Sequence, residues 1–249
     1  MEFVIAPAGV STASAYLLIG LSCFTSMLTA SIGIGGGTVL LAAMAQVVPI
    51  HAVIPVHGVV QLGSNTGRAA ILFPQVSKML VVWFLCGSLV GSIVGGYLVV
   101  DLPVAALKLI LGSFILFSVW SPSIPGLSAN PRSLLGGGFI STVLTMFVGA
   151  TGPFVLALLR VFSLNPQALV ATAACCLTIQ HLVKVLAFGL LGFAFAPYIP
   201  LMILMVISGF IGTLMGKRVL LRVDNTRFEQ GLEIILSVLA IKLLFDGIN

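Results

Sequence analysis

Long apolar stretches, separated by short polar or proline-containing breaks, run along most of the chain. About 20 consecutive apolar residues are enough for a helix to cross a bilayer. The pattern predicts eight such stretches: Ser11–Val48, His51–Phe73, Ser77–Val100, Pro103–Trp120, Leu134–Phe162, Pro166–Ala196, Tyr198–Gly216 and Gly231–Phe245. Segments of about ten residues that alternate between apolar and polar positions, as in a transmembrane β-barrel, are absent from the sequence. We therefore expect an all-α membrane protein.

The first stretch is too long for a single crossing. Its 38 residues would form a helix of about 57 Å, nearly twice the hydrocarbon thickness of a bilayer. A break is predicted at Gly33–Gly37, because adjacent glycines each cost about 1 kcal/mol in a helix interior. The fifth stretch carries a similar break at Gly149–Pro153. A short apolar helix follows each break, at Thr38–Val48 and Phe154–Leu164.

The two breaks belong to an internal repeat. They lie 116 positions apart, and the same offset relates three pairs of polar residues: Ser64 and Gln180, Asn65 and His181, and Arg68 and Lys184. Further along, Gly91–Gly95 is similar to Gly212–Gly216. We expect a first transmembrane repeat over residues 1–120, a linker over 121–133 and a second repeat over 134–249. Duplicated units of this kind are typical of secondary transporters.

The positions of the basic residues favour one topology. If each break is a re-entrant hairpin that returns to its starting side, three full crossings per half remain. Seven loop cations then lie on one face: Lys78, Arg132, Arg160, Lys217, Arg218, Arg222 and Arg227. With four straight crossings per half, these cations would divide five to two. The positive-inside rule thus predicts a polytopic protein of two inverted repeats with both termini outside. The alternative is eight spans in two parallel four-helix repeats.

The composition agrees with immersion in lipid. The chain is 59% hydrophobic with a mean hydropathy of +1.25, and only 17 of its 249 residues are charged. An ordinary soluble domain has about 25% charged residues, so a soluble protein is excluded. Residues 3–216 contain a single acid, Asp101. A sodium site or a carboxylate proton relay is therefore disfavoured.

The breaks are candidate anion sites. A helix that starts within the membrane directs free N–H groups and the positive end of its dipole at the break, and such N-termini bind anions. The first set of candidate substrate-binding residues consists of Gly35, Gly36, Gly37, Thr38, Thr151 and Gly152. The glycines at Gly91–Gly95 and Gly212–Gly216 are instead interpreted as close-packing positions between helices.

Polar residues at helical spacing supply the second set of candidates. His57, Gln61, Ser64 and Arg68 follow one stripe of a helix, with Asn65 beside it. The related helix carries Gln180, His181 and Lys184. Polar groups at membrane depth normally face a cavity, so we expect Gln61, Asn65, Arg68, Gln180, His181 and Lys184 to bind substrate. Lys184, near the middle of its helix, is predicted to supply positive charge. His57 and His181 are candidates for proton coupling.

These motifs resemble a known family. The segment Ser31–Thr38, its second copy Gly149–Pro153, the helix at Asn65–Arg68 and the helix at Gly91–Gly96 are similar to the sulfite exporter TauE/SafE family, also called the toluene sulfonate uptake permeases. The resemblance covers nearly the whole chain. It implies a multi-pass protein of the bacterial inner membrane that transports sulfite, thiosulfate, a sulfonate or a similar organosulfur anion without ATP.

We therefore expect a secondary transporter that works by alternating access on a small anionic substrate within the lipid bilayer. An anion channel with a pore lined by the glycine-rich breaks is the alternative. The sequence has no Walker, zinc or nucleophile motif, so we expect no enzyme activity, no cofactor or metal, and no nucleic-acid partner. The identity of the anion, the direction of transport, the coupling ion and a homodimeric state remain open.

Overall fold

The computed structural model describes residues 5–32, 35–99, 103–120, 129–219 and 225–248. Helices are the only regular secondary structure within these ranges. They are α1 (Thr12–Ile32), α2 (Gly36–Val47), α3 (Ile50–Ile71), α4 (Lys78–Val99), α5 (Val104–Trp120), α6 (Ser133–Val148), α7 (Gly152–Arg160), α8 (Pro166–Leu190), α9 (Ile199–Val219) and α10 (Asn225–Ile248). Two short 3₁₀ turns lie at Phe73–Gln75 and Ala196–Tyr198. The predicted all-helical class is confirmed.

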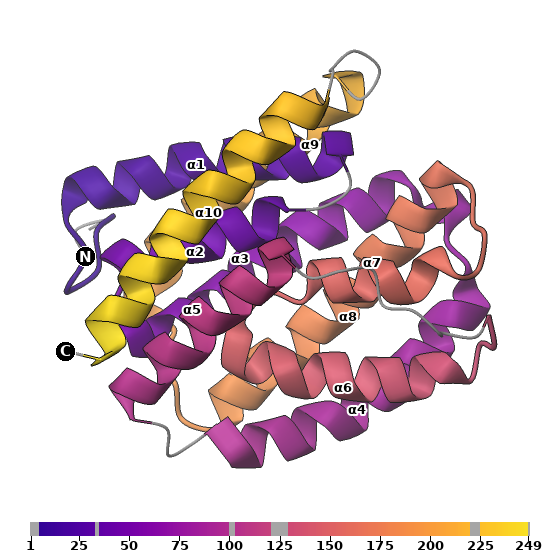
Figure 1. Cartoon of the computed structure of the whole chain (residues 1–249), viewed down its shortest axis with the longest axis horizontal. Coiled ribbons are helices and arrows are strands. Elements are labelled where there is room, and N and C mark those ends of the chain that lie inside the picture. The colour runs from indigo at the N-terminus through magenta and orange to yellow at the C-terminus, as the bar shows by residue number, and fades with distance from the viewer. Residues whose placement is uncertain (1–4, 33–34, 100–102, 121–128, 220–224, 249) are drawn as a thin grey trace.

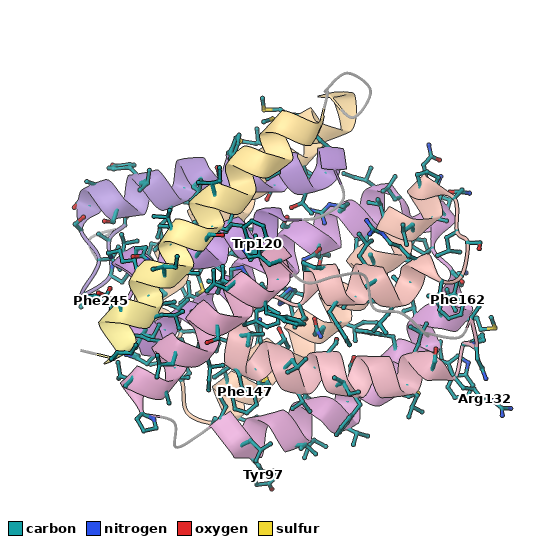
Figure 2. All side chains as sticks on the ribbon, in the orientation of Figure 1. Tyr97, Trp120, Arg132, Phe147, Phe162 and Phe245 are labelled. Carbon is teal, nitrogen blue, oxygen red and sulfur yellow. The ribbon has the colours of Figure 1, made fainter. Side chains whose placement is uncertain are left out.

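Within the described ranges, four segments are long and apolar enough to cross a membrane by length and composition. They are Thr12–Ser31, Lys78–Val99, Pro166–Leu190 and Ala196–Gly216. Many of the exposed large side chains in the described ranges are apolar, for example Leu17, Ile93 and Ile241, each about 60% exposed. An exposed apolar surface of this extent is suited to lipid rather than water. Figure 2 shows another of these exposed side chains, Tyr97, projecting outward from α4.

Both predicted helix breaks are present. α1 ends at Ile32 and α2 begins at Gly36, while α6 ends at Val148 and α7 begins at Gly152. Gly35 has φ +92° and Gly149 has φ +75°, a backbone region that side chains other than glycine rarely adopt. Glycine at these positions therefore ends one helix and allows the next to start. The first two residues of the predicted first break, Gly33 and Ile34, lie outside the described residues.

At both breaks the chain turns back on itself. Gly9, just before α1, lies against the ring of Pro49, just after α2; a Cβ at Gly9 would come within 2.9 Å of Pro49 Cγ. Likewise, a Cβ at Gly137, near the start of α6, would lie 2.6 Å from Leu158 near the end of α7. Each short helix therefore runs back toward the end at which the preceding long helix began, as Figure 1 shows.

Each long helix of the first half packs mainly against a long helix of the second half. α1 packs along α9, α6 along α4, α3 against α8, and α5 against α10. Glycines allow the closest contacts: a Cβ at Gly91 would lie 2.5 Å from the oxygen of Phe139, and a Cβ at Gly212 would overlap with the oxygen of Cys23. Gly95 and Gly216 also lie against the neighbouring helix. The predicted role of these glycines in close packing is confirmed.

The two short helices are buried in protein. Leu40, Leu41 and Met44 of α2 are fully buried in one apolar cluster, and Val155 and Leu159 of α7 belong to a second. Non-helical backbone at membrane depth is tolerated only where protein or a polar cavity surrounds it. The breaks at the start of α2 and α7 meet this condition and lie near the centre of the molecule (Figure 1).

Candidate functional site

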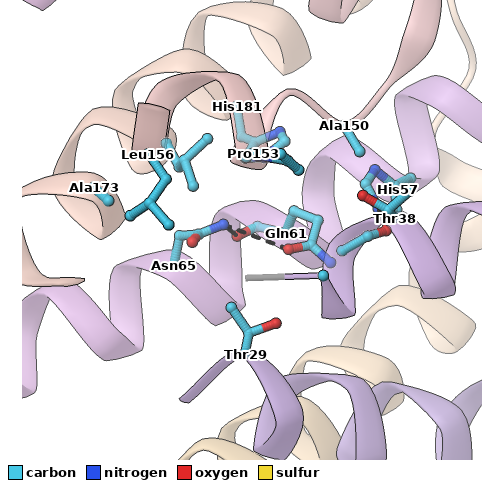
Figure 3. A pocket seen from close by; sticks show the side chains of 14 residues that line it. Thr29, Thr38, His57, Gln61, Asn65, Ala150, Pro153, Leu156, Ala173 and His181 are labelled. Carbon is cyan, nitrogen blue, oxygen red and sulfur yellow. Dashed lines mark hydrogen bonds between the residues drawn. The ribbon is translucent and has the colours of Figure 1, made fainter. Parts of the chain in front are cut away.

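A small, partly open cavity of about 40 Å³ lies between the two breaks. The start of α2 contributes Gly35, Gly37 and Thr38, and the start of α7 contributes Gly152 and Pro153. One water needs about 10–15 Å³ measured in this way, so the cavity has room for roughly three waters or one small polyatomic ion. Figure 3 shows how residues from both halves surround it.

Both short helices present an uncapped N-terminus to the cavity. The first hydrogen bonds within the helices join Val39 N to Gly35 O and Val155 N to Thr151 O, at 3.0 Å each. Neither N-terminus has a side-chain hydrogen bond to cap it. The N–H groups that precede these first bonds therefore lack helical partners. Two such N-termini at one cavity provide donors and positive partial charge for an anion.

Two histidines from different halves meet at the same cavity. His57 in α3 and His181 in α8 lie with ring centroids 6.2 Å apart and planes at 77°. His57 is fully buried and His181 is 3% exposed. His57 Nε2 lies 2.9 Å from the oxygen of Gly37, and because a carbonyl can only accept, this nitrogen donates. The Nδ1 atoms of both histidines are buried and without a hydrogen-bond partner among the described residues.

A chain of polar side chains supports the α3 wall of the cavity. Asn65 Nδ2 donates to the backbone oxygen of Gln61 at 2.8 Å. Arg68 donates to Asn65 Oδ1 at 3.0 Å and to Ser64 Oγ at 3.4 Å. Gln61 and Asn65 line the cavity, whereas Arg68 does not. The Arg68 guanidinium is buried behind the wall and fixes the amide of Asn65.

Lys184 lies behind the second break rather than in the cavity. Its Nζ donates to the oxygen of Gly149 at 2.8 Å and lies 3.5 Å from Thr145 Oγ1. The side chain is fully buried. The last carbonyls of a helix lack partners within the helix, and here the ammonium group supplies one at the end of α6. The predicted contact between Lys184 and an anion stays a prediction.

Three other candidates hold the breaks in place. Gln180 accepts a hydrogen bond of 2.7 Å from Thr151 Oγ1 and donates to Ser141 and Thr142 of α6. Gly36 packs against α1, because a Cβ there would overlap with the backbone oxygen of Thr25. None of these three candidates, Gly36, Thr151 and Gln180, lines the cavity. They connect the start of each short helix to the long helices around it.

A scan against protein families gives one match. The family model described as sulfite exporter TauE/SafE matches residues 18–243, which is nearly the whole chain. The chain belongs to the sulfite exporter TauE/SafE family. No curated protein and no solved structure matches the chain. TauE/SafE is a family of membrane transporters and not of enzymes, and its description implies export or transport of sulfite or another sulfur compound.

For this TauE/SafE member, the structure brings together eight of the predicted site residues around one cavity: Gly35, Gly37, Thr38, His57, Gln61, Asn65, Gly152 and His181. Gly36, Arg68, Thr151, Gln180 and Lys184 are nearby but engaged with other groups. Within the described residues no cluster of three or more His, Cys, Asp or Glu could hold a metal ion. The polar groups that line the cavity are therefore backbone, amide, hydroxyl and imidazole groups.

Six lining residues are not among the predicted ones: Thr29, Ala150, Pro153, Leu156, Ala173 and Leu177. Most are apolar, and an apolar residue in a hydrophobic helix gives no local signal of a site. The repeat offset could have found three of them, because Pro153, Ala173 and Leu177 occupy the positions that correspond to Gly37, His57 and Gln61.

Proposed function

We propose that the chain is a secondary transporter that moves a small sulfur-containing anion, such as sulfite, thiosulfate or a sulfonate, across the bacterial inner membrane by alternating access. The observation that carries this proposal is the shared cavity, where one uncapped helix N-terminus from each half meets the other. Membership of the TauE/SafE family supports a sulfur compound as the cargo.

The direction of corresponding helices supports an inverted repeat. In the α5–α10 pair, Lys108 Nζ donates to the oxygen of Asp246 while Trp120 Nε1 donates to Ser237 Oγ. Residue numbers therefore rise along α5 in the direction in which they fall along α10, so the two helices are antiparallel. When two repeats are related by a twofold axis in the membrane plane, their corresponding helices are antiparallel in this way. Such a pair of halves can rock about a central site, which is the basis of alternating access.

The orientation follows from the basic residues. Lys78 begins α4 and Arg132 directly precedes α6, and these two helices are parallel. Arg160 ends α7, which returns toward the start of α6. These three cations therefore lie at one end of the molecule, where Figure 2 labels Arg132. By the positive-inside rule, this end is cytoplasmic and the protein is multi-pass.

The hydrogen bond of His57 supports proton coupling. Since Nε2 donates to Gly37 O, neutral His57 has an unprotonated Nδ1, which offers a lone pair rather than a donor. Protonation would add both a donor and a positive charge beside the cavity, and an anion favours both. We propose that His57, with His181 beside it, takes up a proton when the anion binds.

Uptake into proteoliposomes tests the proposed function. The panel comprises sulfite, thiosulfate, sulfate, sulfoacetate, taurine and simple carboxylates, and we expect saturable uptake of at least one sulfur anion. Gly152→Ala, which adds a methyl group toward the cavity, should reduce this uptake about tenfold. Gly136→Ala is the matched control, because a Cβ at Gly136 meets nothing within 4 Å.

The same assay separates the transporter from a channel. A channel would give electrical currents that rise with concentration without saturation and do not depend on a binding step. We expect saturation, because the single small cavity between the two breaks can hold only one small ion at a time. Absence of uptake for every sulfur anion, in protein shown to be folded, would contradict the proposal.

A further inference from the structure

The two walls of the cavity differ in chemistry although they come from corresponding helices. His57, Gln61 and Asn65 follow one another at intervals of one turn along α3 and line the cavity. By the 116-residue repeat offset, they correspond to Ala173, Leu177 and His181 in α8, which also line it. Two of the three polar residues of the first wall thus have apolar counterparts in the second. Leu156 of α7, also at the cavity, extends the apolar wall.

The cavity also lacks a fixed charge. Among the described residues that line it there is no Lys, Arg, Asp or Glu. The nearest buried cations are already engaged, Lys184 with Gly149 O and Arg68 with Asn65 and Ser64. Each helix N-terminus is equivalent to about half an elementary positive charge, so two of them balance about one negative charge.

The unpartnered imidazole nitrogens favour a polar ligand at the cavity. A buried polar atom without a hydrogen bond is costly, and such atoms are rare in proteins. Here the Nδ1 atoms of His57 and His181 are both in this condition, on side chains that are at least 97% buried and line the cavity. This observation is independent of the helix N-termini and favours a polar ligand between the two histidines.

We propose that the transported species is a monovalent anion that carries a small apolar group. Its charged oxygen atoms lie toward the helix N-termini and the α3 wall, and its apolar group lies against Leu156, Ala173 and Leu177. A divalent anion is selected against, because its second charge would be buried without compensation. This inference rests on the proposed function and narrows its substrate class. With room for roughly three waters, the apolar group has one or two carbon atoms.

A matched pair of anions tests the proposal. Methanesulfonate and sulfate have the same tetrahedral sulfur, but methanesulfonate has a methyl group where sulfate has a second charged oxygen. Equilibrium binding of both anions is measured on the purified full chain. We expect methanesulfonate to bind at least tenfold more tightly. Equal or tighter binding of sulfate would overturn the proposal.

Variants of the apolar wall test its role. Leu177→Gln gives the second wall the residue found at the corresponding position of the first, and should reduce the preference for methanesulfonate at least threefold. Leu177→Met keeps an apolar side chain and should retain the preference. Ala173→Ser adds a hydroxyl with little volume and should act in the direction of Leu177→Gln, even if the larger change impairs folding. An unchanged preference in folded Leu177→Gln or Ala173→Ser would overturn the assignment of the wall.

The outcomes distinguish this inference from the proposed function. If both anions bind equally and Gly152→Ala weakens both, the cavity is an anion site and only the inference about charge and shape is wrong. If neither anion binds and no anion of the transport panel is taken up, the proposed function itself is wrong, and the inference is overturned with it.

Discussion

The ammonium nitrogen of Lys184 in α8 lies 2.8 Å from the carbonyl oxygen of Gly149, the residue at which α6 ends. Gly58, the neighbour of His57 in α3, lies against the same lysine side chain. Lys184 therefore connects the second break with both central helices. This geometry makes it a positioning residue for the start of α7, which in turn lines the cavity.

Replacing Lys184 should affect stability more than affinity. Lys184→Gln removes a charged donor and leaves the Gly149 carbonyl buried with a weaker partner, at a cost of about 1–3 kcal/mol in unfolding free energy. We expect a lower melting temperature in detergent and a change of less than threefold in anion affinity. Lys184→Arg, which keeps the charge, should recover part of the loss. A tenfold weaker affinity with an unchanged melting temperature would show instead that Lys184 contacts the anion.

The glycines at the start of the short helices should respond differently to the same change. Gly36→Ala should abolish folding, because the new Cβ would overlap with the backbone oxygen of Thr25. Gly152→Ala should fold, because the nearest atom to its Cβ would be Leu177 Cδ1 at 3.9 Å. We expect it to lose about tenfold in affinity, or about 1.4 kcal/mol. Monodisperse yield and binding are the two measurements. Equal yields for both variants would contradict this distinction.

Anion binding should tighten as the pH falls. Methanesulfonate keeps its single charge between about pH 5 and 8, so any change there comes from the protein, where histidine titrates. The groups that face His57 are His181 and Lys184 from α8 and the backbone carbonyls of Gly37 and Gly149. No acidic side chain is among them, so a bound anion is expected to supply the negative charge that favours protonation. The affinity is measured across this pH range.

His57→Gln should reduce this pH dependence, and His181→Gln tests the second imidazole separately. Binding should be accompanied by proton uptake in weakly buffered solution for the wild-type chain. A pH dependence that stays the same in His57→Gln and in His181→Gln would contradict proton coupling through this pair.

Cysteine labelling tests the orientation. The four native cysteines, Cys23, Cys86, Cys175 and Cys176, are first replaced by alanine. In this background Lys78→Cys should be labelled only from the cytoplasmic side, and Ala194→Cys, in the exposed loop after α8, only from the periplasmic side. Labelling of Lys78→Cys from the periplasm would contradict the predicted orientation.

The sequence by itself determined the helices and their breaks. Hydrophobic stretches of sufficient length, interrupted by proline and glycine, predict most helix ends within a few residues, because the backbone must satisfy its own hydrogen bonds in lipid. The exceptions are α8, which ends at Leu190 rather than Ala196, and α10, which begins at Asn225 rather than Gly231. The repeat offset also paired Asn65 with His181 and Arg68 with Lys184 before any contact was known. These are local or periodic properties, and the order of residues is enough to define them.

The tertiary structure alone decided which polar groups face the cavity. Arg68, Gln180 and Lys184 lie on or next to the same polar stripes as Gln61, Asn65 and His181, yet only the last three line the cavity. Each polar stripe extends along its helix beyond the cavity, so the spacing of its residues cannot show which of them reach the cavity. The local pattern around Ala173 and Leu177 likewise gave no sign of a site, and only the repeat offset pointed to these positions. An apolar residue acquires a role in a site only through the position of the helix opposite to it, and the packing of α3 against α8 fixes that position.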